Sequence, residues 1–155
     1  MLKKSLLALA LLAFGILPAA ASTLLGQLAI TTAIATTTAT PVTSFSAVPP
    51  QRMAVQANFV YGSGGTTVDA YLQTSLDQGA TWVDVANWHF TTTSARFIYS
   101  LSALTPNSTQ VTPTDGTMTA NTAKDGVLGN LWRVKYASTG TYAATTLQID
   151  MISGS

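Results

Sequence analysis

Apolar residues alternate with other residues along positions 53–61, MAVQANFVY. Side chains of a β-strand point to opposite faces in turn, so one face collects Met53, Val55, Ala57, Phe59 and Tyr61. Residues 62–65 follow as GSGG, which favours a turn because glycine adopts positive φ without steric cost. The pattern predicts a half-buried strand that ends in a tight turn.

The same alternation recurs along the chain and predicts an all-β fold of about eight strands. The expected strands are Gln27–Ile34, Val42–Ser46, Met53–Tyr61, Val68–Gln73, Trp82–Phe90, Ala95–Leu101, Leu131–Ser138 and Thr145–Ile152. Turns rich in Gly, Pro and Asn between them favour an antiparallel sandwich of two sheets, either jelly-roll or immunoglobulin-like.

Two segments of the sequence, 82–90 and 102–130, depart from this regular pattern. Residues 82–90 are apolar on both faces, which indicates a strand that is covered on both sides or faces a partner. Strict alternation puts Asp84 on the same face as Ala86 and Trp88. The stretch 102–130 is long for a connection inside a compact domain, so it is expected to contain one or two short edge strands.

Composition supports this fold class. The 155 residues include 26 Thr, four Lys and no Glu, and only 8% are charged. Thr is β-branched and suits strands, whereas surface helices usually carry Glu–Lys pairs. Without residues 1–21, five basic residues face six Asp for a net charge of −1. A chain with no basic patch is not expected to bind nucleic acid.

The N-terminus has the features of a secretory signal peptide. Lys3 and Lys4 precede an apolar run at residues 6–17, Pro18 follows, and three alanines place a cleavage site after Ala21. The alternative is an uncleaved apolar helix that anchors in a membrane or docks on a partner. The run of 12 residues is too short to span a bilayer, which needs about 20.

Residues 22–50 are rich in Thr and Ala and nearly uncharged. They are either the first strands of the domain or an arm that pairs with a neighbouring subunit, because they lack the charges that usually protect strand edges. The predicted organisation is therefore a signal peptide or apolar helix at 1–21, Thr/Ala-rich strands or an arm at 22–50, and a β-sandwich at 51–155.

One short motif stands out, at residues 75–82, SLDQGATW. It is similar to the Asp-box of sialidases and other β-proteins, and it implies a hairpin. The Asp accepts backbone hydrogen bonds, the Gly takes a left-handed conformation and the Trp packs across the base. A single copy indicates a structural role for Ser75, Asp77, Gly79 and Trp82.

Catalytic and metal-binding patterns are missing from the sequence. There is no Cys, and His89 is the single histidine, so a zinc site lacks ligands. Nucleophile-elbow, phosphate-loop and dinucleotide motifs do not occur. We expect no enzyme activity, no catalytic residues, no metal and no cofactor.

A longer block resembles a known group of proteins. It includes FVYGSGGTTVDAY at 59–71, HFTT at 89–92 and TPTDGT at 112–117. It resembles small β-sandwich proteins encoded among the virion structural genes of tailed bacteriophages and prophages. That resemblance implies a subunit of the capsid, neck or tail that contacts other virion proteins and forms a homo-oligomer.

Two functions follow as expectations. The first is a non-catalytic virion structural protein, most simply a capsid decoration or head–tail accessory subunit. The alternative is an exported periplasmic or extracellular surface module that binds glycan or protein. For that role the candidate interaction surface is aromatic, formed by Tyr71, Trp88 and Trp132. Membrane contact is expected only through residues 1–21, if they are retained.

Overall fold

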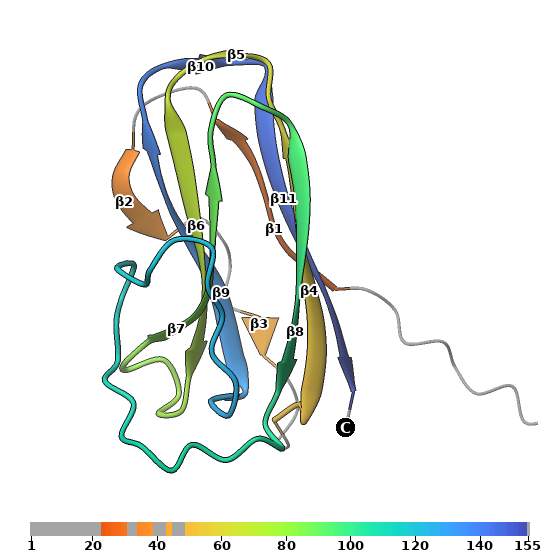
Figure 1. Ribbon diagram of the computed structural model, residues 1–155, viewed down its shortest axis with the longest axis vertical. Helices are drawn as coiled ribbons and strands as arrows, with labels where there is room; N and C mark the ends of the chain where they lie inside the picture. The colour runs from red at the N-terminus through yellow and green to blue at the C-terminus, as the bar shows by residue number, and fades with distance from the viewer. Residues whose placement is uncertain (1–22, 31–33, 39–42, 45–48, 155) are drawn as a thin grey trace, which may run out of the picture.

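In the computed structural model, the described residues are 23–30, 34–38, 43–44 and 49–154 (Figure 1). The predicted signal peptide or apolar helix at residues 1–21 lies outside them. Every regular element in the described part is a β-strand: β1 (Thr23–Ile30), β2 (Ile34–Thr38), β3 (Thr43–Ser44), β4 (Arg52–Val60), β5 (Ser63–Gly64), β6 (Thr67–Ser75), β7 (Val83–Phe90), β8 (Ala95–Ser102), β9 (Leu131–Thr139), β10 (Tyr142–Ala143) and β11 (Thr145–Gly154).

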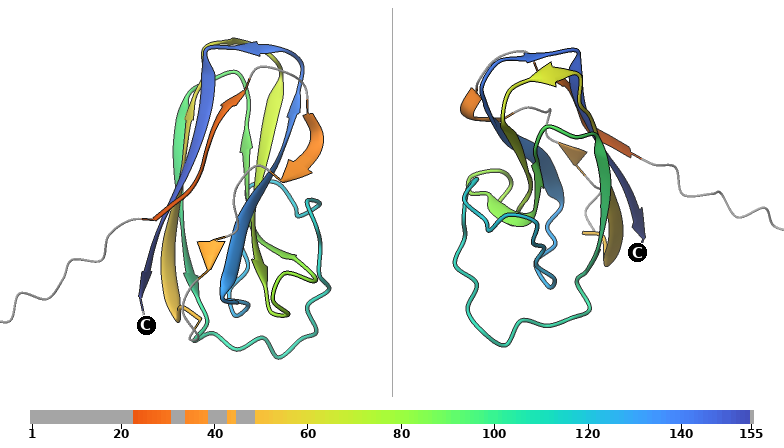
Figure 2. Two further views of the ribbon diagram at one scale, coloured as in Figure 1. Left: turned by 180° about the vertical axis from the view of Figure 1, so that it is seen from behind. Right: turned by 45° about the horizontal axis from the view of Figure 1, so that its top comes forward.

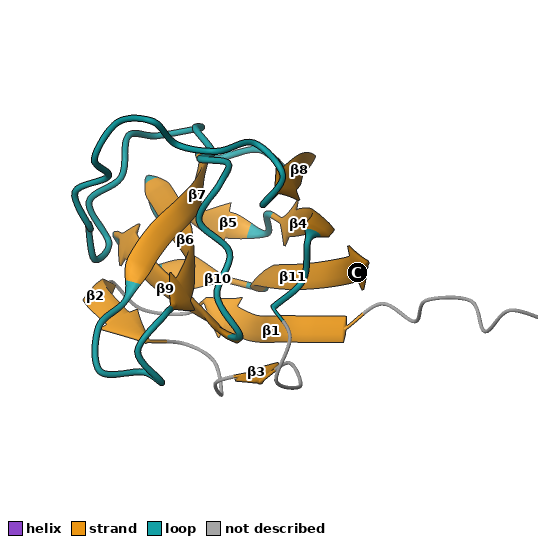
Figure 3. Cartoon of the chain, turned by 90° about the horizontal axis from the view of Figure 1, so that it is seen from below, coloured by secondary structure: helices purple, strands orange, loops and turns teal. Residues whose placement is uncertain are grey.

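The strands form two main antiparallel sheets. The first sheet has the order β1-β11-β4-β8, and the second has the order β2-β9-β6-β7, with β3 also paired to β9. Seen from below, the two sheets lie one over the other (Figure 3). A short β5–β10 pair crosses the top of the molecule (Figure 2).

The pairing is nested along the chain. If β2 and β3 are counted as one broken strand along β9, β1 pairs with the last long strand, β11, and β2/β3 with the second last, β9. Further in, β4 pairs with β8, and β6 with β7. The first and last described strands therefore pair in the first sheet, and the middle of the chain forms the β6–β7 hairpin in the second.

The strands predicted from residue 53 onward are confirmed as β4, β6, β7, β8, β9 and β11. The N-terminal prediction is less accurate. The first strand begins at Thr23, four residues before the predicted start, and residues 34–38 form β2 where no strand was predicted. All three N-terminal strands pair with strands of the same chain, β11 or β9. These three strands therefore belong to the two main sheets.

The core lies between the two sheets and is built from the alternating apolar positions. Phe59 of β4 stacks on Phe90 of β7 with ring centroids 4.8 Å apart. Trp88 of β7 contacts Tyr99 of β8 at 5.4 Å. Both contacts join one sheet to the other, so burial of these rings holds the layers together.

The long connection at 103–130 contains no strand, which corrects the prediction of one or two short edge strands. Its one bridge joins Ala123 to Ala86 of β7. Backbone hydrogen bonds from Asp84 to Thr114, from Asn87 to Thr122 and from Lys124 to Val85 hold it along β7. The edge of β7 is thereby covered by backbone hydrogen bonds.

Replacement of Phe59 by Ala should lower the free energy of unfolding by about 3–5 kcal/mol, because it leaves a cavity between the sheets. Leu76→Ala is the control, since Leu76 is 66% exposed and its truncation should cost less than about 0.5 kcal/mol. Urea denaturation followed by Trp fluorescence measures both. Equal losses in the two variants would contradict the described core.

Candidate functional site

The Asp-box residues form the turn between β6 and β7. The carboxylate of Asp77 accepts hydrogen bonds from the backbone N and hydroxyl of Thr81, at 2.8 and 2.6 Å. The hydroxyl of Ser75 donates to Asp77 at 2.8 Å and accepts from the backbone N of Gly79 at 2.7 Å. Gly79 has φ +92°, which a residue with a side chain rarely adopts.

These bonds make the Asp77 carboxyl group more acidic. Hydrogen bonds from the Thr81 side chain and backbone, and then from Ser75, lower the pKa of Asp77 to about 2. Trp82 closes the turn beside Gly79, and the guanidinium of Arg133 lies 4.2 Å from the centre of its ring. The polar groups of the motif form hydrogen bonds with one another, and these bonds stabilise the turn.

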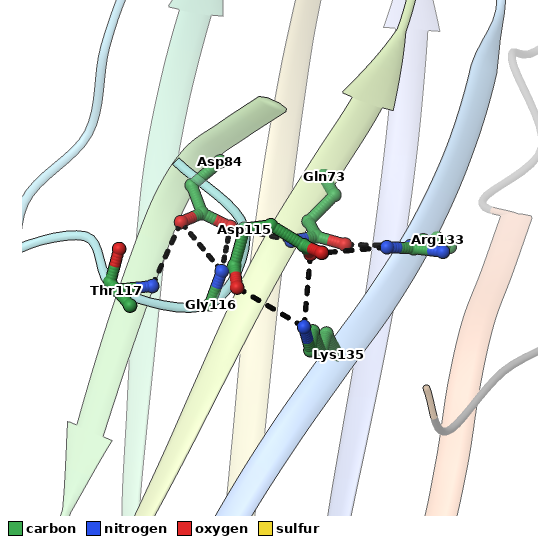
Figure 4. A network of polar contacts seen from close by, with 7 residues as sticks. All are labelled: Gln73, Asp84, Asp115, Gly116, Thr117, Arg133 and Lys135. Atoms are coloured by element: carbon green, nitrogen blue, oxygen red, sulfur yellow. Dashed lines mark hydrogen bonds and ion pairs between the residues drawn. The ribbon is translucent and has the colours of Figure 1, made fainter. Parts of the chain in front are cut away.

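A polar network lies next to this turn on the outer face of the second sheet (Figure 4). Its centre is Asp84, a fully buried carboxylate. Asp84 accepts two bonds of 2.9 Å from the backbone N of Gly116 and one of 3.1 Å from that of Thr117. The side-chain amide of Gln73 adds a bond of 2.7 Å. The carboxylate therefore holds the 114–117 turn on the sheet, since a buried charge needs such donors.

Asp115 binds the same turn to β9. Its carboxylate accepts bonds from Gln73 at 2.8 Å, Arg133 at 3.1 Å and Lys135 at 3.0 Å. The Gln73 hydrogen bond lowers the pKa of Asp115 most, followed by the hydrogen bond and charge of Lys135 and the charge of Arg133, against an opposing effect of burial. Gln73 joins both carboxylates and also accepts a bond from Arg133 Nε at 2.6 Å.

A register shift in β7 produces this arrangement. Leu72 pairs with Ala86, but the next residue, Gln73, pairs with Asp84, so Val85 has no partner in β6. An extra residue of this kind reverses the facing of the residues beyond it. Asp84 therefore lies with Gln73 on the outer face and not on the face of Trp88, as strict alternation predicted.

The predicted aromatic surface of Tyr71, Trp88 and Trp132 is not formed. Trp88 and Trp132 are 0% exposed and belong to the core, because they occupy inward-facing positions of β7 and β9. The indole N of Trp132 donates to the carbonyl of Gly129 at 3.0 Å. Tyr71 alone of the three remains half-exposed on the outer face.

Tyr71 lies beside a hydrogen-bonded pair of side chains. His89 Nδ1 is 2.8 Å from Asp69 Oδ1, and both side chains are partly exposed. Burial, then the charges of Asp69 and Asp84, raise the pKa of the Tyr71 hydroxyl. These three residues form a small, partly exposed polar patch on β6 and β7.

The outer face of the first sheet has a different character. It exposes Leu24, Val60, Ile98 and Ile152 among amides and Thr. A shallow hollow between β4, β8 and β11 is lined by Gln56, Ile98, Asp150 and other residues. Charge is sparse on this face, which suits contact with another protein surface.

The described residues contain no group of three or more His or Asp side chains that could hold a metal ion. Within the same ranges, no helix is long and apolar enough to cross a membrane. Comparison with protein-family models, curated proteins and solved structures finds no match to the chain.

Asp84→Asn should lower the free energy of unfolding by about 2 kcal/mol or more, because the Asn amide places its NH2 group against buried backbone donors. Asp150→Asn is the matched control, since Asp150 is half-exposed and bonds only to Gln148 among the described residues. We expect it to change stability little. Urea unfolding compares the two, and equal stability of both variants would contradict the role given to Asp84.

Asp77 should contribute to the pH dependence of stability. Its folded pKa of about 2 lies below the usual value of 3.8 for an Asp side chain. Its contribution to stability is therefore full above the unfolded pKa and is lost as pH falls through the folded pKa. The stability difference between the parent and Asp77→Asn should therefore shrink between about pH 5 and pH 2. Urea unfolding across this range measures it. A difference that stays constant would contradict the assignment.

Proposed function

We propose that this chain is a non-catalytic structural subunit of a phage virion. Its role would be to decorate the capsid or to serve as a head or tail accessory subunit bound to a protein lattice. The observation that carries the proposal is the nested strand order, in which the first long strand pairs with the last and each pair lies inside the previous one. This is the order of a jelly-roll sandwich, an architecture used by viral capsid domains.

The side chains support a passive role. Two buried polar residues of the second sheet, Asp84 and Gln73, use their side-chain hydrogen bonds to hold the 114–117 turn. The exposed faces combine isolated aliphatic residues with amides and few charges. Such a surface can bind a protein lattice through shape and backbone contacts, with little dependence on salt.

A second candidate function is an exported surface module that binds glycan or protein. It is favoured by the apolar run at residues 6–17 and by the half-exposed Tyr71 beside the Asp69–His89 pair. Jelly rolls also occur in lectins, and an aromatic ring beside hydrogen-bonding groups suits a sugar.

Mass spectrometry of particles purified from cells that express the chain with its phage or prophage tests the first function. We expect the protein at a stoichiometric ratio to the major capsid protein, and an intact mass that shows whether the chain begins at Met1 or Ser22. Its absence from particles, together with a chain that begins at Ser22 in the periplasm or medium, would contradict the virion role and favour the exported module.

A further inference from the structure

The outer edge of β8 differs from the other edges of the two sheets. The edge of β7 is covered by residues 114–124. The edge formed by β2 and β3 is split between two short strands, and β1 has a register shift between Leu24 and Gly26. In contrast, β8 pairs with β4 without a shift from Ala95 to Ser102. A regular edge of this length is a template for another strand.

The backbone of β8 shows which groups are available. The backbone N of Ala103 donates to Gln51 on the β4 side, whereas the N of Ser102 donates to Asp125 and its carbonyl accepts from Gly126. Neighbouring residues of an antiparallel strand direct their backbone groups to opposite sides. The backbone groups of Arg96, Ile98 and Ser100 therefore face away from β4, and they have no hydrogen-bond partner among the residues that the structure describes.

Side chains on both faces of this edge are apolar and accessible. Ile98 is 62% exposed on the outer face, and Phe97 is 45% exposed on the inner face beside Phe90. The protective devices that edge strands usually carry, such as Pro, a bulge or inward-pointing charges, are not found between Ala95 and Ser102. Arg96 supplies the single charge of the strand.

We propose that β8 pairs antiparallel with β8 of a second copy of this chain. The three available residues of each strand meet the three of the other only when Ile98 lies opposite Ile98 of the second copy. Arg96 then lies opposite Ser100, and each of these facing pairs exchanges two backbone hydrogen bonds. On the inner face Phe97 lies opposite Tyr99 of the other copy, an aromatic cross-strand pair. The two first sheets become one continuous sheet.

Charge complementarity selects a second copy in the antiparallel sense. Each edge has a cation at one end, Arg96, and an anion at the other, Asp125, which is exposed and bonded to the backbone of Ser102. Antiparallel pairing brings Arg96 of one copy toward Asp125 of the other at both ends. Parallel pairing would place like charges together, which is unfavourable.

This pairing stands on the geometry of β8 and is independent of the proposed virion role, since an exported module could use the same edge. Failure of the virion experiment would leave the pairing intact, and failure of the pairing would leave the virion role open to its own test.

The test is sedimentation velocity and light scattering on protein purified from cells that express the full chain. We expect a particle with twice the mass of one chain. Ile98→Lys places two ammonium groups opposite each other and should weaken dimerisation by at least about tenfold. Ser100→Pro removes a backbone N–H at the edge that does not bond to β4. It should weaken dimerisation to the same extent, and the monomer should remain folded.

Leu76→Lys is the matched control, because Leu76 is similarly exposed but lies on the β6–β7 turn; its dimer should be unaffected. The chain has no Cys, so Ile98→Cys tests the register directly by forming a disulfide-linked dimer under mild oxidation. A monomer at all concentrations up to about 100 μM, a dimer that both edge variants leave intact, or a failure of Ile98→Cys to crosslink would overturn the proposal.

Discussion

The structure depends on how its sheet edges are closed. Two sheets packed face to face leave four edge strands, and each edge presents backbone groups that need a partner or water. The 114–124 stretch closes the β7 edge with backbone hydrogen bonds, and the Asp84 carboxylate fixes the 114–117 turn by accepting bonds from the backbone N of Gly116 and Thr117. The edge of β8 stays open. The long loop therefore determines which side of the molecule is free for association.

The buried polar groups that stabilise the fold are different from the groups that are accessible at the surface. Asp84 and Gln73 are fully buried and hydrogen-bonded within the chain, so they are structural groups. The accessible groups lie elsewhere, at Tyr71 with the Asp69–His89 pair on one sheet and around Ile98 on the other. The molecule therefore has two different accessible faces.

Much of the fold could be predicted from alternation alone. The period of two identified β4 and the five long strands after it, and buried positions alternate with more exposed ones most clearly along β4, β9 and β11. Alternation did not predict the facing or burial of a residue where contacts between distant parts of the sequence determine it. The extra residue at Val85 moved Asp84 to the other face, and Trp88 and Trp132 became core residues although aromatic type alone suggested a surface. The cover over β7 could not be predicted, because its hydrogen bonds join residues about 30 positions apart.

Amide hydrogen exchange, resolved by residue with NMR, tests this account most directly. The amides of Asp84 and Asn87 face the 114–122 segment, whereas those of Ile98 and Ser100 face outward from β8. We predict that Asp84 and Asn87 are protected at every protein concentration, and that Ile98 and Ser100 exchange quickly when dilute and become protected as concentration rises. Fast exchange at Asp84 and Asn87, or protection at Ile98 that does not depend on concentration, would contradict it.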